Sequence, residues 1–346
     1  MITINTVSKK YGKAEVLNLE SLEIPTGQSF GLVGNNGAGK TTLFNILLDL
    51  IRPTTGSVIN NDISVHKSES WKTFTGSFID ESFLITYLTP EEYFQFIGDL
   101  RGINKADIKE FLGQFDEFFN DEVLEKKKYL RDLSKGNQKK AGIIGALIGH
   151  PEIVILDEPF ANLDQNLKEK IQDNLKLILK KSGLTSIIVT HDKNEAFYLG
   201  DYCGILLNKK LVQFDTPYNI HHKPNSREIV EFFNRGVLLP AKVTGKNSLF
   251  NEDLGEIKGE FTKSFSTNQS VDLLIQPEDL IYDEKSELKF DIIEKKFRGA
   301  NFIYILKTKN NKKIPVLVHS HNQSELLNAN KFGIKKPIYI DHLICF

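Results

Sequence analysis

The chain has 346 residues, of which 40% are hydrophobic and 26% are charged. This composition is ordinary for a globular protein with a sizeable core, and the length predicts two domains. The formal net charge of -1 argues against a general nucleic-acid-binding protein, because such proteins are usually basic. The two cysteines form no closely spaced pair, so neither a disulfide framework nor a zinc site is expected.

The sequence shows no sign of a secretory signal or a membrane span. Its first residues lack a basic segment followed by an apolar one, and no apolar run approaches the roughly 18 residues that a membrane helix needs. We therefore expect a reducing, cytosolic location, and any role at a membrane would come through a partner.

Short segments within residues 1–30 alternate apolar and polar side chains, which predicts antiparallel strands. Tyr11 lies in this region, shortly before a glycine-rich loop. An aromatic ring in this place can stack on a purine base, but it can equally be a strand aromatic that packs in the core. The residues themselves leave both interpretations open.

The glycine-rich loop at 34–42 follows the phosphate-binding pattern G-x-x-x-x-G-K-[ST]. An apolar run at 29–33 predicts a strand before it, and helical spacing at 42–48 predicts a helix after it. Main-chain N–H groups and the helix N-terminus would then face the phosphates. Lys40 would reach the β- and γ-phosphates, Thr41 would bind Mg²⁺ and Thr42 would contact the α-phosphate. The predicted nucleotide-binding residues are Gly34, Asn35, Asn36, Gly37, Ala38, Gly39, Lys40, Thr41 and Thr42.

Two further apolar runs end in polar residues that suit phosphate chemistry. The run at 153–156 ends in Asp157 and Glu158, as buried parallel strands do when they deliver acids to a site. Asp157 could hold Mg²⁺ through water, and Glu158 could deprotonate a water aimed at the γ-phosphate. The run at 186–190 ends in His191, which could bind the γ-phosphate. Strand-end carboxylates at a turn and a structural histidine are the alternatives.

Residues 90–130 place apolar side chains at helical spacing and predict a mostly helical insert. Ser134 and Gly136 then stand at the start of a segment whose small and apolar residues suit a buried helix. The N–H groups at its N-terminus could bind an anion or simply be capped by the serine. After a helix with a linker at 216–233, short strand-like runs recur, which suggests a small barrel of the oligonucleotide/oligosaccharide-binding (OB) type without a nucleic-acid surface. These runs are 271–275, 289–293, 302–306, 314–318 and 337–340, with Asn310 and Asn311 as a hairpin turn.

The phosphate loop, Leu-Ser-x-Gly at 133–136, the acidic strand end, Ala-Asn-Leu-Asp at 161–164 and the strand-end histidine occur in one order. Because they carry this set of motifs in this order, residues 1 to about 235 resemble the ATP-binding subunit of ABC transporters. The resemblance implies a Walker A loop at Asn35–Thr42, a Walker B strand with its catalytic glutamate at Ile153–Glu158, signature residues Ser134, Gly136 and Asn137, a D-loop aspartate Asp164, a switch histidine His191 and a base-stacking Tyr11.

The implied fold is α/β, a P-loop NTPase of ABC type over residues 1–235. It would contain a parallel core sheet, an antiparallel β subdomain and a helical subdomain at about 81–150, and an OB-like or TOBE-like regulatory β domain would follow over 236–346. In this family two subunits face head to tail, and the signature of one closes over the ATP held by the other. The implied partners are a second ATPase subunit, expected to be a second copy, transmembrane permease subunits at the inner face of the membrane and a solute-binding protein, but no nucleic acid.

The chain departs from the family pattern at two places. In the usual signature, Leu-Ser-Gly-Gly-Gln, Lys135 replaces the first glycine and Asn137 the glutamine. A glutamine is also expected after the strand at 76–79, where Asp80 or, less favoured, Glu81 stands. Asp80 could still bind Mg²⁺ beside the attacking water, but a carboxylate cannot donate a hydrogen bond to that water. Slower turnover or altered coupling would follow.

The two halves also resemble different branches of the family. Residues 76–81 and 133–136 look like exporter subunits, whereas 158–160, 275–280 and 297–299 resemble importers with an appended regulatory barrel, such as those for ferric iron, polyamines, sulfate and sugars. An appended barrel favours an importer of an ion or small solute. An exporter subunit and a non-transport nucleotide switch are the alternatives.

Overall fold

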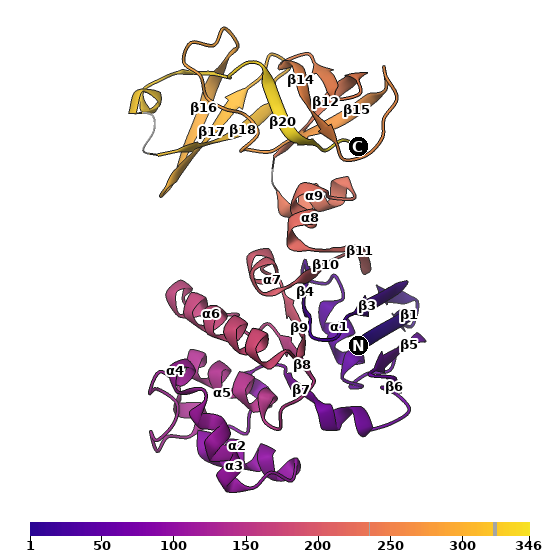
Figure 1. Ribbon diagram of the computed structural model, residues 1–346, viewed down its shortest axis with the longest axis vertical. Coiled ribbons are helices and arrows are strands. Elements are labelled where there is room, and N and C mark those ends of the chain that lie inside the picture. The colour runs from indigo at the N-terminus through magenta and orange to yellow at the C-terminus, as the bar shows by residue number, and fades with distance from the viewer. Residues whose placement is uncertain (235, 321–323) are drawn as a thin grey trace. The chain divides into compact units, whose positions relative to one another are not determined.

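The computed structural model describes residues 1–234, 236–320 and 324–346. The chain divides into two compact units, Met1–Ile220 (unit 1) and His221–Phe346 (unit 2), and Figure 1 labels many of their elements. The predicted domain boundary falls on residue 235, which lies outside the described residues, and it stays a prediction. Among the described helices, none is both long enough and apolar enough to cross a membrane.

Unit 1 contains a six-stranded sheet in the order β11-β10-β4-β9-β8-β7, parallel except for the β10–β11 pair. Every residue of β8 and β9 is buried, as expected for parallel strands covered on both faces. The parallel core sheet of the predicted fold is therefore confirmed. Its strands are β4 (Ser29–Gly34), β7 (Thr75–Phe78), β8 (Ile153–Asp157), β9 (Thr185–Thr190), β10 (Tyr202–Leu207) and β11 (Lys210–Asp215).

A second sheet in unit 1 is antiparallel and has the order β2-β1-β5-β6, with β3 also paired to β1. In β1, Ile2 and Ile4 point inward and are fully buried, whereas Thr3 between them is partly exposed. This alternation is why the N-terminal segment forms a half-buried strand. The strands are β1 (Ile2–Tyr11), β2 (Ala14–Asn18), β3 (Ser21–Ile24), β5 (Thr55–Asn60) and β6 (Ile63–Ser64).

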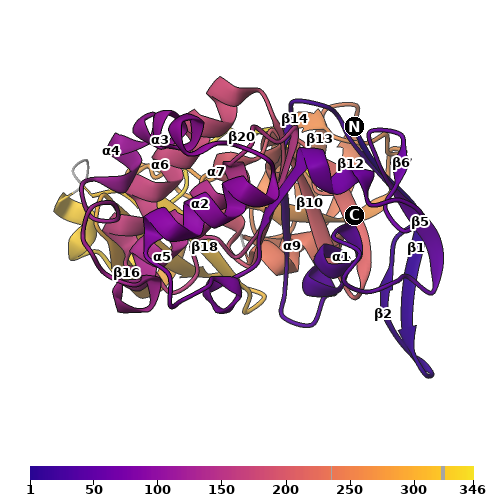
Figure 2. The same cartoon turned by 90° about the horizontal axis from the view of Figure 1, so that it is seen from below.

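The helical group α2–α5 and the antiparallel sheet lie on opposite sides of the parallel strands, as both views show (Figures 1 and 2). Helix α2 begins at a capping box in which Thr89 and Glu92 bond each other's main chain, which explains its sharp start. The predicted helical subdomain is present. The helices are α1 (Lys40–Leu47), η1 (Ser70–Phe74), η2 (Glu81–Phe83), α2 (Pro90–Leu100), α3 (Lys105–Gly113), α4 (Asp116–Phe119), η3 (Leu130–Asp132), α5 (Lys135–Leu147), α6 (Gln165–Ser182) and α7 (Lys193–Leu199).

Unit 2 is mostly β, with sheets in the orders β15-β12-β13-β14-β20 and β18-β17-β16-β19. The five predicted runs correspond to β15, β16, β17, β18 and β20, and Asn311 adopts φ 61° in the predicted hairpin turn. Four further strands, β12, β13, β14 and β19, were not predicted. Helix α8 (Pro217–His222) begins in unit 1 and ends in unit 2. The elements that follow it are α9 (Arg227–Phe233), β12 (Val237–Gly245), β13 (Ser248–Asn251), β14 (Gly255–Phe261), β15 (Ser270–Ile275), β16 (Lys289–Arg298), β17 (Asn301–Lys307), β18 (Lys313–His319), η4 (Ser324–Leu327), β19 (Lys331–Gly333) and β20 (Ile338–Leu343).

Asp279 makes the stability of unit 2 depend on pH. Burial raises the pKa of its carboxyl to about 7, and the charges of Glu278 and Asp341 add to this, although the Gln276 N–H donates to Asp279 Oδ2 over 2.7 Å. The folded state then holds a proton that the unfolded state has lost, so stability falls as pH rises from about 4 to about 7. We expect Asp279→Asn, which keeps an acceptor, to stabilise the protein at neutral pH by on the order of 2 kcal/mol.

Thermal unfolding at pH 5 and pH 8 measures this effect. The gain in Tm for Asp279→Asn should be larger at pH 8 than at pH 5. Glu284→Gln removes one exposed carboxylate from the same unit and should change both Tm values little. An equal change in Tm at both pH values for Asp279→Asn would contradict the assignment.

Candidate active site

The phosphate loop of 34–42 connects the end of β4 to the start of α1. Gly39 adopts φ +107°, and a Cβ there would lie 2.8 Å from the Val16 carbonyl oxygen, so both conformation and space require glycine. The buried Lys40 side chain folds back across the loop, where its ammonium donates to the Gly34 oxygen at 2.7 Å and the Asn35 oxygen at 3.3 Å. The structure therefore places a cation at the centre of the predicted phosphate site.

The acidic residues lie at the carboxyl end of β8, at the same edge of the sheet. Asp157 is the last residue of β8 and is buried, and Glu158 follows it with φ +45°. The Glu158 N–H donates to the Val189 oxygen of β9 over 2.8 Å. Its Oε2 lies 2.7 Å from Nδ1 of His191, which follows β9. Three predicted residues from two strands are thus brought together.

The electrostatics of this edge suit a bound cation. Burial raises the pKa of Asp157 to about 6, and the charge of Glu158 acts in the same direction, while Lys40 opposes them. Burial lowers the pKa of Lys40, while the charges of Glu158 and Asp157 act to raise it. A divalent cation beside Asp157 would relieve this clustering of negative charge, and Thr41 offers a hydroxyl at the exposed start of α1. These oxygen donors fit Mg²⁺.

Asp80 comes to the same edge from β7. Its Oδ1 accepts a hydrogen bond from the Ser82 N–H over 2.6 Å and so caps η2. Its negative charge also acts to raise the pKa of Asp157. The alternative residue, Glu81, faces Lys139 instead, with Oε1 3.8 Å from Nζ.

The residues predicted to contact the nucleotide of a second subunit lie at two adjacent helix N-termini. Ser134 caps α5 by accepting from the Asn137 N–H over 3.2 Å, and Asp164 caps α6 by accepting from the Leu167 N–H over 3.0 Å. A Cβ on Gly136 would lie 2.4 Å from Leu167 Cδ2, so the first turns of α5 and α6 are in close contact. These hydrogen bonds are local, and the contact with a second subunit stays a prediction.

Tyr11 is 56% exposed at the end of β1, so the alternative that it packs in the core is wrong. The Lys9 ammonium lies 4.9 Å from the centre of its ring. An exposed aromatic ring has its face available for stacking, but stacking on a base stays a prediction.

Two lysines near the site were missed by sequence reasoning. Lys139 of α5 is 2% exposed and donates to the main-chain oxygen of Glu158 over 2.8 Å. Lys168 of α6 pairs with Asp192 at 2.7 Å and with Glu195 at 2.6 Å, which fixes the segment after His191. A lysine in a helix gives no sequence signal of burial, because such lysines are usually exposed.

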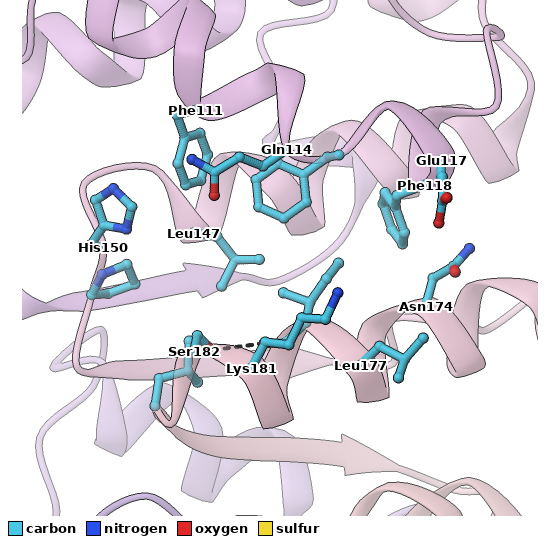
Figure 3. Close-up of a pocket in the computed structure, with 14 residues that line it drawn as sticks. Phe111, Gln114, Glu117, Phe118, Leu147, His150, Asn174, Leu177, Lys181 and Ser182 are labelled. Carbon is cyan, nitrogen blue, oxygen red and sulfur yellow. Dashed lines mark hydrogen bonds between the residues drawn. The ribbon is translucent and has the colours of Figure 1, made fainter.

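A separate pocket of about 450 Å³ lies at the opposite edge of the sheet, where β8 and β9 begin (Figure 3). Phe111 and Phe118 line it from one side, and Leu177 and Lys181 of α6 from the other, with His150 at one end. None of the predicted site residues belongs to this pocket. It is therefore distinct from the phosphate loop, which lies at the carboxyl ends of the strands, where α/β sheets bind their ligands.

Comparison with known proteins agrees with this geometry. The family model described as "ABC transporter" matches residues 17–161. The spermidine/putrescine import ATP-binding protein PotA of Clostridium acetobutylicum is 27% identical over 312 residues, which cover 90% of this chain and 88% of that protein. The Fe(3+) ions import ATP-binding protein FbpC of Haemophilus influenzae is 28% identical over 295 residues, covering 83% of this chain and 82% of that protein. Both alignments are longer than unit 1, so the likeness extends into unit 2.

The fold of unit 1 is also that of solved ATP-binding cassettes. A dimeric cassette in a post-hydrolysis state, bound to ADP and Pi, aligns with a TM-score of 0.56 and 25% identity, covering 63% of this chain and 99% of that chain. The prediction of an ABC-type P-loop ATPase followed by a small β domain is confirmed. Residues 17–161 thus match the ABC transporter family model, and unit 1 has the fold of solved ATP-binding cassettes.

Proposed function

We propose that this chain is the ATPase subunit of an ABC importer for an ion or a small solute. The observation that carries the proposal is the pair formed by Glu158 and His191, 2.7 Å apart, at the sheet edge that also holds Asp157 and Lys40. A carboxylate held by an imidazole beside a phosphate-binding lysine is suited to direct water at a terminal phosphate.

Each residue then has a distinct task in the hydrolysis of ATP to ADP and phosphate. Glu158 orients the attacking water and accepts its proton. Lys40 and His191 donate hydrogen bonds to the γ-phosphate, where negative charge develops in the transition state. The main-chain N–H groups of 35–42 hold the phosphates, and Tyr11 stacks on the base.

Three oxygen-bearing side chains would hold Mg²⁺: Thr41, Asp157 through water, and Asp80. When bound, the ion neutralises part of the phosphate charge. Asp80 accepts hydrogen bonds but cannot donate one, so it cannot support the attacking water as an amide would. We therefore expect slower turnover than with glutamine at this position.

Two copies would complete each nucleotide site. Ser134, Gly136, Asn137 and Asp164 of one copy would face the phosphate loop of the other, because the positive ends of α5 and α6 lie together and suit an anionic ligand. The dimeric cassette to which unit 1 is similar supports this arrangement.

Permease subunits at the inner face of the membrane and a solute-binding protein are the remaining partners that an importer needs. The importer assignment is supported by the two relatives named for import of spermidine/putrescine and of ferric iron, because their alignments extend into unit 2. The exporter alternative rests only on the residue patterns at 76–81 and 133–136.

The ATPase rate of the full chain, measured over a wide range of protein concentration, tests the shared site. We expect the rate per molecule to rise with concentration and then level off as dimers form. A rate per molecule that is independent of concentration would contradict a site completed by a second copy. For import, cells carrying the inactive Glu158→Gln chain should lose uptake of a solute such as spermidine or ferric iron, whereas a loss of efflux alone would favour the exporter.

A further inference from the structure

Lys139 is a buried cation that connects three elements of the active site. It belongs to α5, its side chain is 2% exposed, and its ammonium donates to the Glu158 main-chain oxygen over 2.8 Å. On its other side, Oε1 of Glu81 in η2 lies 3.8 Å away. Burying a lysine is costly unless it is paired and hydrogen-bonded. These two contacts satisfy that requirement.

The contact with Glu158 is made at a main chain with an unusual conformation. Glu158 has φ +45°, a region that residues other than glycine rarely adopt. Its N–H is bonded to Val189, and its oxygen accepts from both the Lys139 ammonium and the Ala161 N–H, the latter at 3.1 Å. The residue is thus held on both sides of its Cα, which sets the direction in which its carboxylate leaves the main chain.

The contact with Glu81 links this arrangement to the segment after β7. Glu81 is the first residue of η2, directly after Asp80, and its side chain is 16% exposed. The neighbouring Lys140 has different partners, because its ammonium pairs with Glu122 at 2.9 Å and donates to the Phe119 oxygen at 3.4 Å. The two adjacent lysines of α5 are therefore both buried but differ in whether they reach the catalytic segment.

We propose that Lys139 is a positioning residue for ATP hydrolysis, which holds the Glu158 main chain so that its carboxylate points at the attacking water, and that Glu81 keeps Lys139 in place. This inference rests on the proposed role of Glu158. In this role Lys139 acts only through the main chain of Glu158. Its loss should therefore lower kcat while leaving ATP binding nearly unchanged.

Steady-state ATPase kinetics of the full chain test this inference. For Lys139→Met, which keeps the length of the side chain without the ammonium, we expect kcat to fall by roughly 10- to 100-fold and KM for ATP to change by less than about threefold. Glu81→Gln should lower kcat by a smaller factor. In the double variant the two effects should not multiply, because both act through one contact.

Lys140→Met is the matched control, since it removes a similarly buried cation from the same helix. It should keep kcat near the parental value, and thermal unfolding should show that both variants fold. Equal losses of kcat in Lys139→Met and Lys140→Met would overturn the inference. If Glu158→Gln is inactive while Lys139→Met keeps the parental kcat, the inference is wrong and the proposed function stands. If Glu158→Gln itself keeps the parental kcat, the proposed role of Glu158 is wrong and the inference falls with it.

Discussion

Replacing Lys40 with alanine is expected to weaken ATP binding by at least about 100-fold and to abolish measurable hydrolysis. The Lys40 ammonium sits across the phosphate loop on the oxygens of Gly34 and Asn35, at 2.7 and 3.3 Å. Its charge offsets those of Asp157 and Glu158 at this edge. Without it, a triphosphate would meet two carboxylates with no compensating charge from the loop. Equilibrium binding of a fluorescent ATP analogue measures the loss directly.

Lys40→Met is the companion variant, because it retains the aliphatic stem that fills the loop. It should bind ATP as poorly as Lys40→Ala but unfold at a temperature closer to that of the parent. Lys13→Ala, which removes an exposed lysine from the turn between β1 and β2, should bind ATP normally. ATP affinity within about threefold of the parent in either Lys40 variant would show that the loop binds phosphates through its main chain alone.

The parts of the site that could be predicted from the sequence are those made by neighbouring residues. The loop of 34–42 is contiguous, and its glycines, its lysine and the flanking strand and helix are all visible in one stretch. Asp157 and His191 were found for a related reason. The carboxyl ends of parallel strands meet at one edge, so polar residues that end buried runs come together. The pairing of His191 with Glu158 could not be read from this rule, which fixes the edge but not the side-chain contacts.

Lys139 and Lys140 show what the sequence could not reveal. Two adjacent lysines are typical of an exposed helix face, yet they are only 2% and 4% exposed. Helix α5 is covered on several sides, because it packs against β7 and β8 and also against α2, α4 and η2. The partners that make burial tolerable, Glu158 and Glu122, are distant in the sequence. Only the folded chain shows that these charges are paired.

The strands missed in unit 2 have a similar explanation. In β12 the side chains of Leu239, Ala241 and Val243 alternate inward, but Pro240 interrupts the run and argues against a strand. In the structure the Pro240 oxygen accepts from the Asn251 Nδ2 group over 2.8 Å, so the strand is tied to β13 through a side chain. Strand β14 pairs in parallel with β20, some eighty residues further along the chain. Pairing between strands so far apart along the chain leaves no local pattern in the sequence.

The variant Glu158→Gln is expected to lower kcat by roughly 100- to 10,000-fold while leaving ATP affinity within about threefold of the parent. In the parent, His191 Nδ1 lies 2.7 Å from Glu158 Oε2, and an amide of the same size can still form this hydrogen bond. The amide cannot, however, accept the proton of the attacking water. Lys40 and the phosphate loop are unchanged, so nucleotide still binds. The enzyme should therefore stop after ATP has closed the two copies together.

Size-exclusion chromatography with and without ATP separates this outcome from a general loss of function. Glu158→Gln should elute as a stable dimer with ATP and as a monomer without it, whereas the parent should return to monomer as ATP is consumed. Glu152→Gln is the matched control, since Glu152 stands just before β8, at the end remote from the site, and its Oε2 accepts a hydrogen bond from the Asn61 side chain at 2.6 Å. It should hydrolyse ATP at the parental rate. If Glu158→Gln also does so, the water is activated by another group, and Asp80, the remaining carboxylate near Asp157, becomes the residue to test.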